Sequence, residues 1–128
     1  MMPMTWEELA SCQQAMAQEL MATQDPRFAR GVCGHAYYAA YALVTARLPQ
    51  SMAFGRGWHN PEHAKLPAHV NHIAGLGESA RRTVRQALRR LRQRREDSDY
   101  RPGITVDQAT ARECLRDATT VFSHLNRS

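Results

Sequence analysis

One segment of the sequence, residues 32–44, is apolar over too much of its surface to lie on the outside of a helical protein. At helical spacing its apolar side chains cover more than half of the circumference. They are Val32, Cys33, Ala36, Tyr37, Ala39, Ala40, Leu43 and Val44. A helix of this kind has to be surrounded by other elements, and its alanines let them approach closely. The segment therefore predicts a bundle with this helix at its centre.

Helical spacing dominates the rest of the 128 residues as well, and no stretch alternates like a strand. Capping boxes at 5–8 and 105–108 predict a first helix that ends near Thr23 and a last helix that carries residues up to Leu125. Asp25 and Pro26 predict the start of the second helix, which ends near Leu48 before a proline. We expect one all-α domain over residues 1–128, a bundle of four to five mostly antiparallel helices.

Two further segments complete this expectation. Residues 49–76 contain several glycines and prolines, which predict a loop with one or two short helical turns. Residues 79–97 predict the fourth helix, and the sequence SDYRPG that follows predicts a turn. No apolar run is long enough to cross a membrane, and we expect neither a membrane span nor a signal peptide.

The first helix and the cysteines lead to two predictions about burial. Leu9, Cys12, Met16 and Leu20 share one helical stripe, which we expect to face the core. The three cysteines are Cys12, Cys33 and Cys114, and they are odd in number and far apart. We expect buried free thiols of a reducing cytoplasm, without a disulfide framework or a zinc ribbon.

The positive charge of the chain belongs to one helix. Residues 81–95 contain eight of the seventeen basic residues and no acidic residue, and the rest of the chain has net charge −3. Arginine forks suit phosphate and carboxylate, so a nucleic acid or an acidic partner is as good an explanation as a solvated surface. The predicted helix has an apolar seam formed by Ala80, Val84, Ala87, Leu88 and Leu91. The arginines that point away from this seam are Arg81, Arg82, Arg85, Arg89 and Arg92.

Arg95 differs, because it follows the apolar seam to the edge of the core. Asp99 lies four residues later and can reach it if the last helical turn persists, and Tyr100 can cover the pair. Two interpretations stay open for this cluster. It is either part of a binding site or a salt bridge that closes a helix end.

The central helix also has a polar side, formed by Arg30, Gly34, Tyr38, Tyr41 and Thr45, with Gly31 and His35 beside it. Glycine inside a helix costs about 1 kcal/mol relative to alanine, which suggests that a ligand or another backbone approaches closely here. The alternative is that the tyrosines, Tyr37 and Tyr41 above all, are core residues whose hydroxyls find local partners.

Four histidines lie in the stretch HNPEHAKLPAHVNH, residues 59–72, and its first five residues have the letters of an inverted zinc-protease motif. Pro61 interrupts the continuous helix that this motif requires, so we do not expect proteolysis. The remaining interpretations are a polar loop or adventitious metal binding by His59, His63, His69 and His72. We predict no dedicated metal site and no cofactor.

Two stretches resemble the HEPN family of helical domains, which occurs in prokaryotic toxin–antitoxin and defence systems. GHAYYAAYALVTARL is similar to the helix of that family with a polar pair before Tyr-Tyr-Ala, and LRRLRQRREDSDYRPGITVDQA is similar to its Arg-x3-Asp-Tyr ending. The resemblance covers roughly residues 5–125. It implies a helical bundle, a homodimer, a nucleotidyltransferase-type partner, and a loop histidine that leans over the polar side of the central helix.

The resemblance also implies activities. Many HEPN domains are metal-independent ribonucleases with an Arg-x4-6-His signature, and Arg30, His35 and Tyr37 reproduce Arg-x4-His-x-Tyr. In some members the tyrosine of this signature accepts nucleotides from the partner enzyme. Arg30 and His35 are thus the candidate catalytic residues. The candidate binding residues are Tyr37, Tyr38, Tyr41, Arg81, Arg85, Arg89, Arg92, Arg95, Asp99 and Tyr100.

Three functions remain open on the sequence alone. The preferred one is a module that binds RNA, a nucleotide or a nucleotidyltransferase-type partner. The second is an endoribonuclease toxin that uses Arg30 and His35. The third is an interaction protein that docks an acidic partner through residues 79–97.

Overall fold

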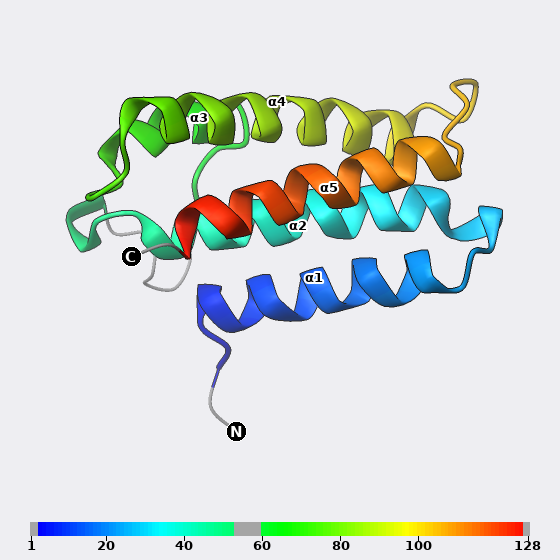
Figure 1. Cartoon of the computed structure of the whole chain (residues 1–128), viewed down its shortest axis with the longest axis horizontal. Helices are drawn as coiled ribbons and strands as arrows, with labels where there is room; N and C mark the ends of the chain where they lie inside the picture. The colour runs from blue at the N-terminus through cyan, green and yellow to red at the C-terminus, as the bar shows by residue number, and fades with distance from the viewer. Residues whose placement is uncertain (1–2, 53–59, 127–128) are drawn as a thin grey trace.

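The computed structural model describes residues 3–52 and 60–126, and all of their regular structure is helical. The α-helices are α1 (Trp6–Ala22), α2 (Ala29–Arg47), α3 (Leu66–His69), α4 (Glu78–Tyr100) and α5 (Gln108–Leu125). Short 3₁₀ turns occupy Pro26–Phe28, Gln50–Met52 and Val70–His72. Figure 1 shows that the long helices alternate in direction, so that α2, α4 and α5 each run antiparallel to the long helix before them. The predicted all-α bundle and the predicted short turns between residues 49 and 76 are confirmed.

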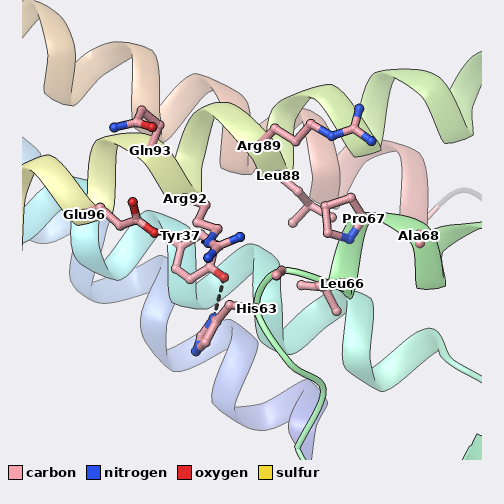
Figure 2. A pocket seen from close by; sticks show the side chains of 11 residues that line it. Tyr37, His63, Leu66, Pro67, Ala68, Leu88, Arg89, Arg92, Gln93 and Glu96 are labelled. Atoms are coloured by element: carbon pink, nitrogen blue, oxygen red, sulfur yellow. Dashed lines mark hydrogen bonds and ion pairs between the residues drawn. The ribbon is translucent and has the colours of Figure 1, made fainter.

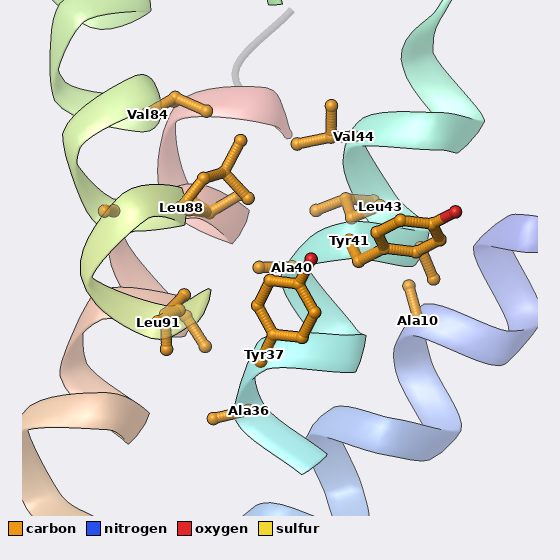
Figure 3. Close-up of a cluster of buried hydrophobic side chains, with 14 of the residues drawn as sticks. Ala10, Ala36, Tyr37, Ala40, Tyr41, Leu43, Val44, Val84, Leu88 and Leu91 are labelled. Carbon is orange, nitrogen blue, oxygen red and sulfur yellow. The ribbon is translucent and has the colours of Figure 1, made fainter. Parts of the chain in front are cut away.

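Helix α2 lies at the centre, where it packs against α1, α4 and α5. The eight apolar residues that predicted a central helix are all buried. Figure 3 shows Val84, Leu88 and Leu91 of α4 pointing at α2, while Tyr41 points toward α1. Five of the twelve buried residues of α2 are alanines, and these small side chains let three helices surround it at once.

Only part of the stripe predicted for α1 faces the core, because Leu9 and Leu20 pack against buried residues and the other two members do not. Ala10, Gln14 and Ala17 are buried, whereas Cys12 is exposed and Met16 is 44% exposed. Small side chains on this face let α1 lie close to α2. A Cβ atom on Gly31 of α2 would lie only 3.2 Å from Leu20 Cδ1. The Leu20 side chain of the predicted stripe therefore packs against Gly31, while Cys12 and Met16 lie outside the contact with α2.

Caps fix the helix starts, with two differences from the sequence prediction. The Thr5 side chain accepts a hydrogen bond from Glu8 N, as the first capping box predicts. Asp25 caps a 3₁₀ turn, and α2 begins after it at Ala29. The last helix is capped by Asp107, whose carboxylate accepts from the Thr110 N–H, and so the predicted cap at Thr105 is wrong.

Helix α4 continues to Tyr100, three residues beyond its predicted end, where the sequence predicted a turn. The Arg30 side chain of α2 explains the extension. Its Nη1 donates to the carbonyl oxygens of Asp97 and Ser98 at 3.0 Å each. The guanidinium also binds the carbonyls of Arg101, Pro102 and Ile104 in the following turn. Carbonyls at a helix end lack the full set of helical partners, and the Asp97 carbonyl accepts only a long bond of 3.3 Å from Arg101 N, so Arg30 stabilises the last turn of α4.

An arginine at the other end of α2 joins two more helix ends. Arg47 binds both carboxylate oxygens of Glu7 at the start of α1, at 2.6 and 3.0 Å. It also donates to the Leu125 carbonyl at 3.3 Å and to Asn126 Oδ1 at 2.7 Å, where α5 ends. We call this group the Arg47 clasp.

The cysteines differ in burial. Cys12 is exposed, and so the prediction of burial is wrong for it, because α1 packs through another face. Cys33 and Cys114 are buried free thiols, as predicted, and their sulfur atoms lie 3.0 Å apart. None of the described helices is long and apolar enough to cross a bilayer.

Candidate anion-binding cavity

A cavity of about 400 Å³ lies between α2, residues 63–68 and α4. Figure 2 shows it from close by, with Arg92 extending from α4 toward Tyr37 of α2. One wall is aromatic, one is apolar, and the wall formed by α4 is mainly polar and charged. The residues that line it are Tyr37, His63, Ala64, Leu66, Pro67, Ala68, Leu88, Arg89, Arg92, Gln93 and Glu96.

The aromatic wall is a tyrosine–histidine pair. The hydroxyl of Tyr37, a residue only 1% exposed, lies 2.5 Å from His63 Nδ1. Burial raises the pKa of the Tyr37 phenol well above its ordinary value. Burial also lowers the pKa of His63, and the nearby charges of Arg95 and Arg92 lower it further. At neutral pH the pair is therefore a phenol beside an uncharged imidazole.

Arg89 stands out among the arginines of α4. Arg92 Nε lies 3.2 Å from Glu96 Oε1, so its charge is partly balanced within the cavity. Arg89 is exposed at the edge of the cavity and has no hydrogen-bond or ion-pair partner among residues 3–52 and 60–126. Among the other arginines of residues 81–95, only Arg82 also lacks a hydrogen-bond or ion-pair partner within the described part of the chain. The others bind the Ile73 carbonyl, Asn71, Glu78, Asp117, Glu96, Glu113 and Asp99.

Arg95 forms a cluster beside this cavity. Its guanidinium carbon lies 5.2 Å from the ring centres of both Tyr38 and Tyr100. Its Nη2 donates to the Tyr38 hydroxyl at 2.6 Å and to the Tyr100 hydroxyl at 3.2 Å, and its Nε lies 3.1 Å from Asp99 Oδ2. The last turn of α4 does persist, and it brings Asp99 and Tyr100 to Arg95 as the spacing predicted. The guanidinium is therefore already engaged by a carboxylate and two aromatic rings.

Tyr41 is buried and its hydroxyl binds a backbone carbonyl. Its hydroxyl donates to the Pro61 carbonyl at 2.5 Å, and burial raises the pKa of the phenol to about 12. Its ring centre lies 4.8 Å from that of His63. Tyr41 thus holds the segment around Pro61 against α2, and the segment carries His63 to Tyr37. These contacts fit the interpretation of core tyrosines whose hydroxyls find local partners.

The candidate catalytic residues Arg30 and His35 have different surroundings. Arg30 is directed to the carbonyls at the end of α4, and His35 Nδ1 lies 2.6 Å from Gln13 Oε1 on α1. They share no contact, and neither lines the cavity. Arg81 and Arg85 likewise lie outside it, bound to residues near the start of α4.

His63 is the member of the site that residue patterns did not single out. The resemblance implied a loop histidine over the polar side of α2, and the structure has one, but nothing in the spacing distinguished His63 from three others. His59 lies outside the described residues. No group of three potential metal-ligating side chains occurs in the described ranges, 3–52 and 60–126.

Comparison with known proteins agrees with this architecture. The family model of the HEPN domain matches residues 10–128. Searches of curated proteins and of solved structures gave no significant match. A match over nearly the whole chain, together with the all-helical bundle, identifies the family: this chain belongs to the HEPN domain family.

Proposed function

We propose that the protein binds a phosphate group of RNA or of a nucleotide in the cavity between α2, residues 63–68 and α4. The observation that carries the proposal is Arg89, an exposed arginine at the cavity edge without a partner in the described part of the chain. HEPN membership supports a helical module of the nucleotide-binding or ribonuclease type.

The electrostatics of the cavity support an anionic ligand. The positive charges of Arg95 and Arg92, which lower the pKa of His63, also favour the binding of a negative group beside it in the cavity. A guanidinium binds phosphate through two parallel hydrogen bonds, and Arg89 has both donors available. The volume lies within the range of about 300–1,000 Å³ that is typical of small-ligand sites.

The test is binding of a fluorescent single-stranded RNA, measured by anisotropy at several salt concentrations, with ATP as competitor. We expect Arg89→Ala to weaken binding about tenfold, the loss of one charged hydrogen-bonding group. The slope of log affinity against log salt should fall by about 0.7, which corresponds to one released phosphate contact.

Arg112→Ala is the matched control, because Arg112 is also an exposed arginine but lies on α5, away from the cavity. It should leave affinity and salt slope unchanged. Equal losses in both variants would mean diffuse attraction to a basic surface. Absence of binding to either RNA or ATP would refute the proposed function itself.

Metal-independent cleavage of RNA is a second candidate, which the resemblance to ribonucleases of the family suggests. It proceeds by attack of a ribose 2′-hydroxyl on the adjacent phosphate, with an imidazole as base and an arginine stabilising the added charge. His63 has support for this role, since it is uncharged and lines the cavity with Arg92. The alternative of Arg30 with His35 has less support, because Arg30 is engaged by backbone carbonyls.

Incubation with total RNA in EDTA compares these assignments directly. Cleavage that is lost in His63→Ala and kept in His35→Ala supports the cavity. The reverse pattern supports the pair taken from the sequence signature, and no cleavage by the wild-type chain leaves binding as the function.

The resemblance supports further proposals about context: a homodimer, a nucleotidyltransferase-type partner that modifies Tyr37, and a toxin–antitoxin or defence setting in the cytoplasm. Docking of an acidic partner through residues 79–97 has weaker support, because most arginines of this run already have partners. Sedimentation velocity tests the dimer. Co-purification with the product of a neighbouring gene tests the partner.

A further inference from the structure

Two cysteine thiols face each other in the core, apart from the proposed phosphate site. Cys33 of α2 is fully buried, and Cys114 of α5 is 1% exposed. Their Sγ atoms lie 3.0 Å apart, with Cys114 as the hydrogen-bond donor. A disulfide bond is about 2.05 Å long, so a shift of about 1 Å would join them.

We propose that Cys33 and Cys114 form an oxidation site, at which an intramolecular disulfide links α2 to α5 when the protein meets a peroxide. The inference does not depend on the proposed phosphate binding. It rests on the position of the two sulfur atoms, which the fold brings together across 81 residues of sequence.

The surroundings give the two thiols different roles. The hydrogen bond from Cys114 lowers the pKa of the Cys33 thiol and outweighs burial, which raises it, while Ser98 and the charges of Arg94 and Arg30 add to the lowering. The same contact and burial raise the pKa of Cys114. Because the thiolate is the reactive form, Cys33 is the nucleophile and Cys114 the thiol that completes the link.

The reaction balances with one peroxide. The Cys33 thiolate attacks hydrogen peroxide, the O–O bond breaks, and Cys33 sulfenic acid and hydroxide result. The Cys114 sulfur then attacks the sulfenic sulfur, loses its proton, and displaces the hydroxyl group as water. Both cysteines are oxidised, the peroxide is reduced to two water molecules in total, and one S–S bond replaces two S–H bonds.

Burial determines the rate of this reaction. The oxidant reaches the thiols only when α5 moves away from α2 locally, and such openings require less free energy than global unfolding. Oxidation of the folded chain should therefore be slow. It should become faster in urea below the unfolding transition, whereas an exposed thiol would react at a rate that urea hardly changes.

The experiment uses a Cys12→Ser parent, which removes the exposed thiol and with it linkage between chains. The folded, reduced parent is treated with hydrogen peroxide and digested without reduction for mass spectrometry. We expect a peptide pair joined through Cys33 and Cys114 that lacks two hydrogen atoms and separates on reduction. The oxidised parent should also have a higher melting temperature, because the link closes a long loop.

Cys114→Ala in the same parent is the control, and it should accumulate the sulfenic acid at Cys33, detected with dimedone. The parent alone decides the question if this variant does not fold. The proposal is wrong if peroxide leaves both thiols of the folded parent free, adds oxygen without linkage, or links them only after unfolding.

Discussion

The surroundings of the His63 imidazole oppose its protonation. Burial and the charges of Arg95 and Arg92 lower its pKa, and only Glu96 acts in the other direction. Tyr37, whose hydroxyl lies against Nδ1, is uncharged across the same pH range because burial raises its pKa. Protonation of this one residue therefore disturbs both the hydrogen bond and the local charge balance.

The pH dependence of stability follows from the direction of this shift. The unfolded chain, in which His63 has a pKa of about 6.5, takes up the proton before the folded chain does. The contribution of His63 is thus complete above about pH 6.5 and is lost as the pH falls through the lower folded-state value. Urea unfolding of wild type and His63→Gln should show a stability difference that shrinks below about pH 6.5. A difference that stays constant with pH would contradict the assignment.

The hydroxyls of Tyr37 and Tyr41 allow a paired test of the hydrogen bond between Tyr37 and His63. Tyr37→Phe and Tyr41→Phe each remove one buried hydrogen bond and keep the ring, at an expected cost of about 1 kcal/mol in the free energy of unfolding. Only Tyr37→Phe should also change the titration of His63, which NMR of the imidazole measures. If neither substitution changed the pKa of His63, burial of the rings and not the Tyr37 hydrogen bond would set that pKa.

At the scale of the helix, α4 depends on a side chain 67 residues before the carbonyl it binds. Local sequence could predict where α4 begins and which face it buries. It could not predict the end at Tyr100, because the stabilising group belongs to α2. The same reason explains Arg30 itself: its spacing to His35 matches a family signature, while its contacts make it a helix-terminating residue.

Arg30→Ala should lower the free energy of unfolding by about 2 kcal/mol, because several backbone carbonyls lose a charged donor. Amide exchange should become faster at residues 97–104. Arg30→Lys should not restore either property, since an ammonium group cannot span these carbonyls. Arg27→Ala is the control, because Arg27 pairs with Asp25 at the surface, and it should lower stability much less than Arg30→Ala does.

The start of α5 gives a further element-scale prediction. Asp107→Ala should lower the free energy of unfolding measurably, because the Thr110 N–H loses its N-cap acceptor. Thr105→Ala should change stability by less than about 0.5 kcal/mol, because Thr105 is exposed and does not cap the helix. Chemical denaturation of the two variants distinguishes the caps, and a larger loss at Thr105 would refute this assignment.

At the scale of the whole molecule, the order of the helices and the central place of α2 could be predicted from the sequence. The apolar side chains around more than half of the circumference of residues 32–44 were sufficient to predict the central helix, because only a helix surrounded by others buries so wide an apolar surface. The face of α1 could be predicted only in part: Leu9 and Leu20 pack against the core as expected, but the helix buries Ala10, Gln14 and Ala17 and leaves Cys12 and Met16 exposed. His63 also escaped prediction, because its contact with Tyr37 depends on how the segment around Pro61 packs on α2.

Ala40 tests the close packing of the bundle. It is fully buried in α2, and Figure 3 shows it between Tyr37 and the leucines of α4. Ala40→Leu should lower the free energy of unfolding by about 1–3 kcal/mol, because a larger side chain separates packed helices. Ala109→Leu, at an exposed position of α5, should be nearly neutral. Thermal unfolding compares the stabilities of the two variants. An Ala40→Leu variant as stable as the wild type would mean that the core around Ala40 is not closely packed.

Arginines stand near both ends of α2, with Arg30 holding the end of α4 and the Arg47 clasp holding the start of α1 and the end of α5. The length of α2 therefore sets the length that its neighbours must have. One inserted turn would lengthen it by about 5.4 Å and separate one arginine from its partners. Insertions and deletions of one turn within α2 should consequently lower stability, which thermal unfolding would measure.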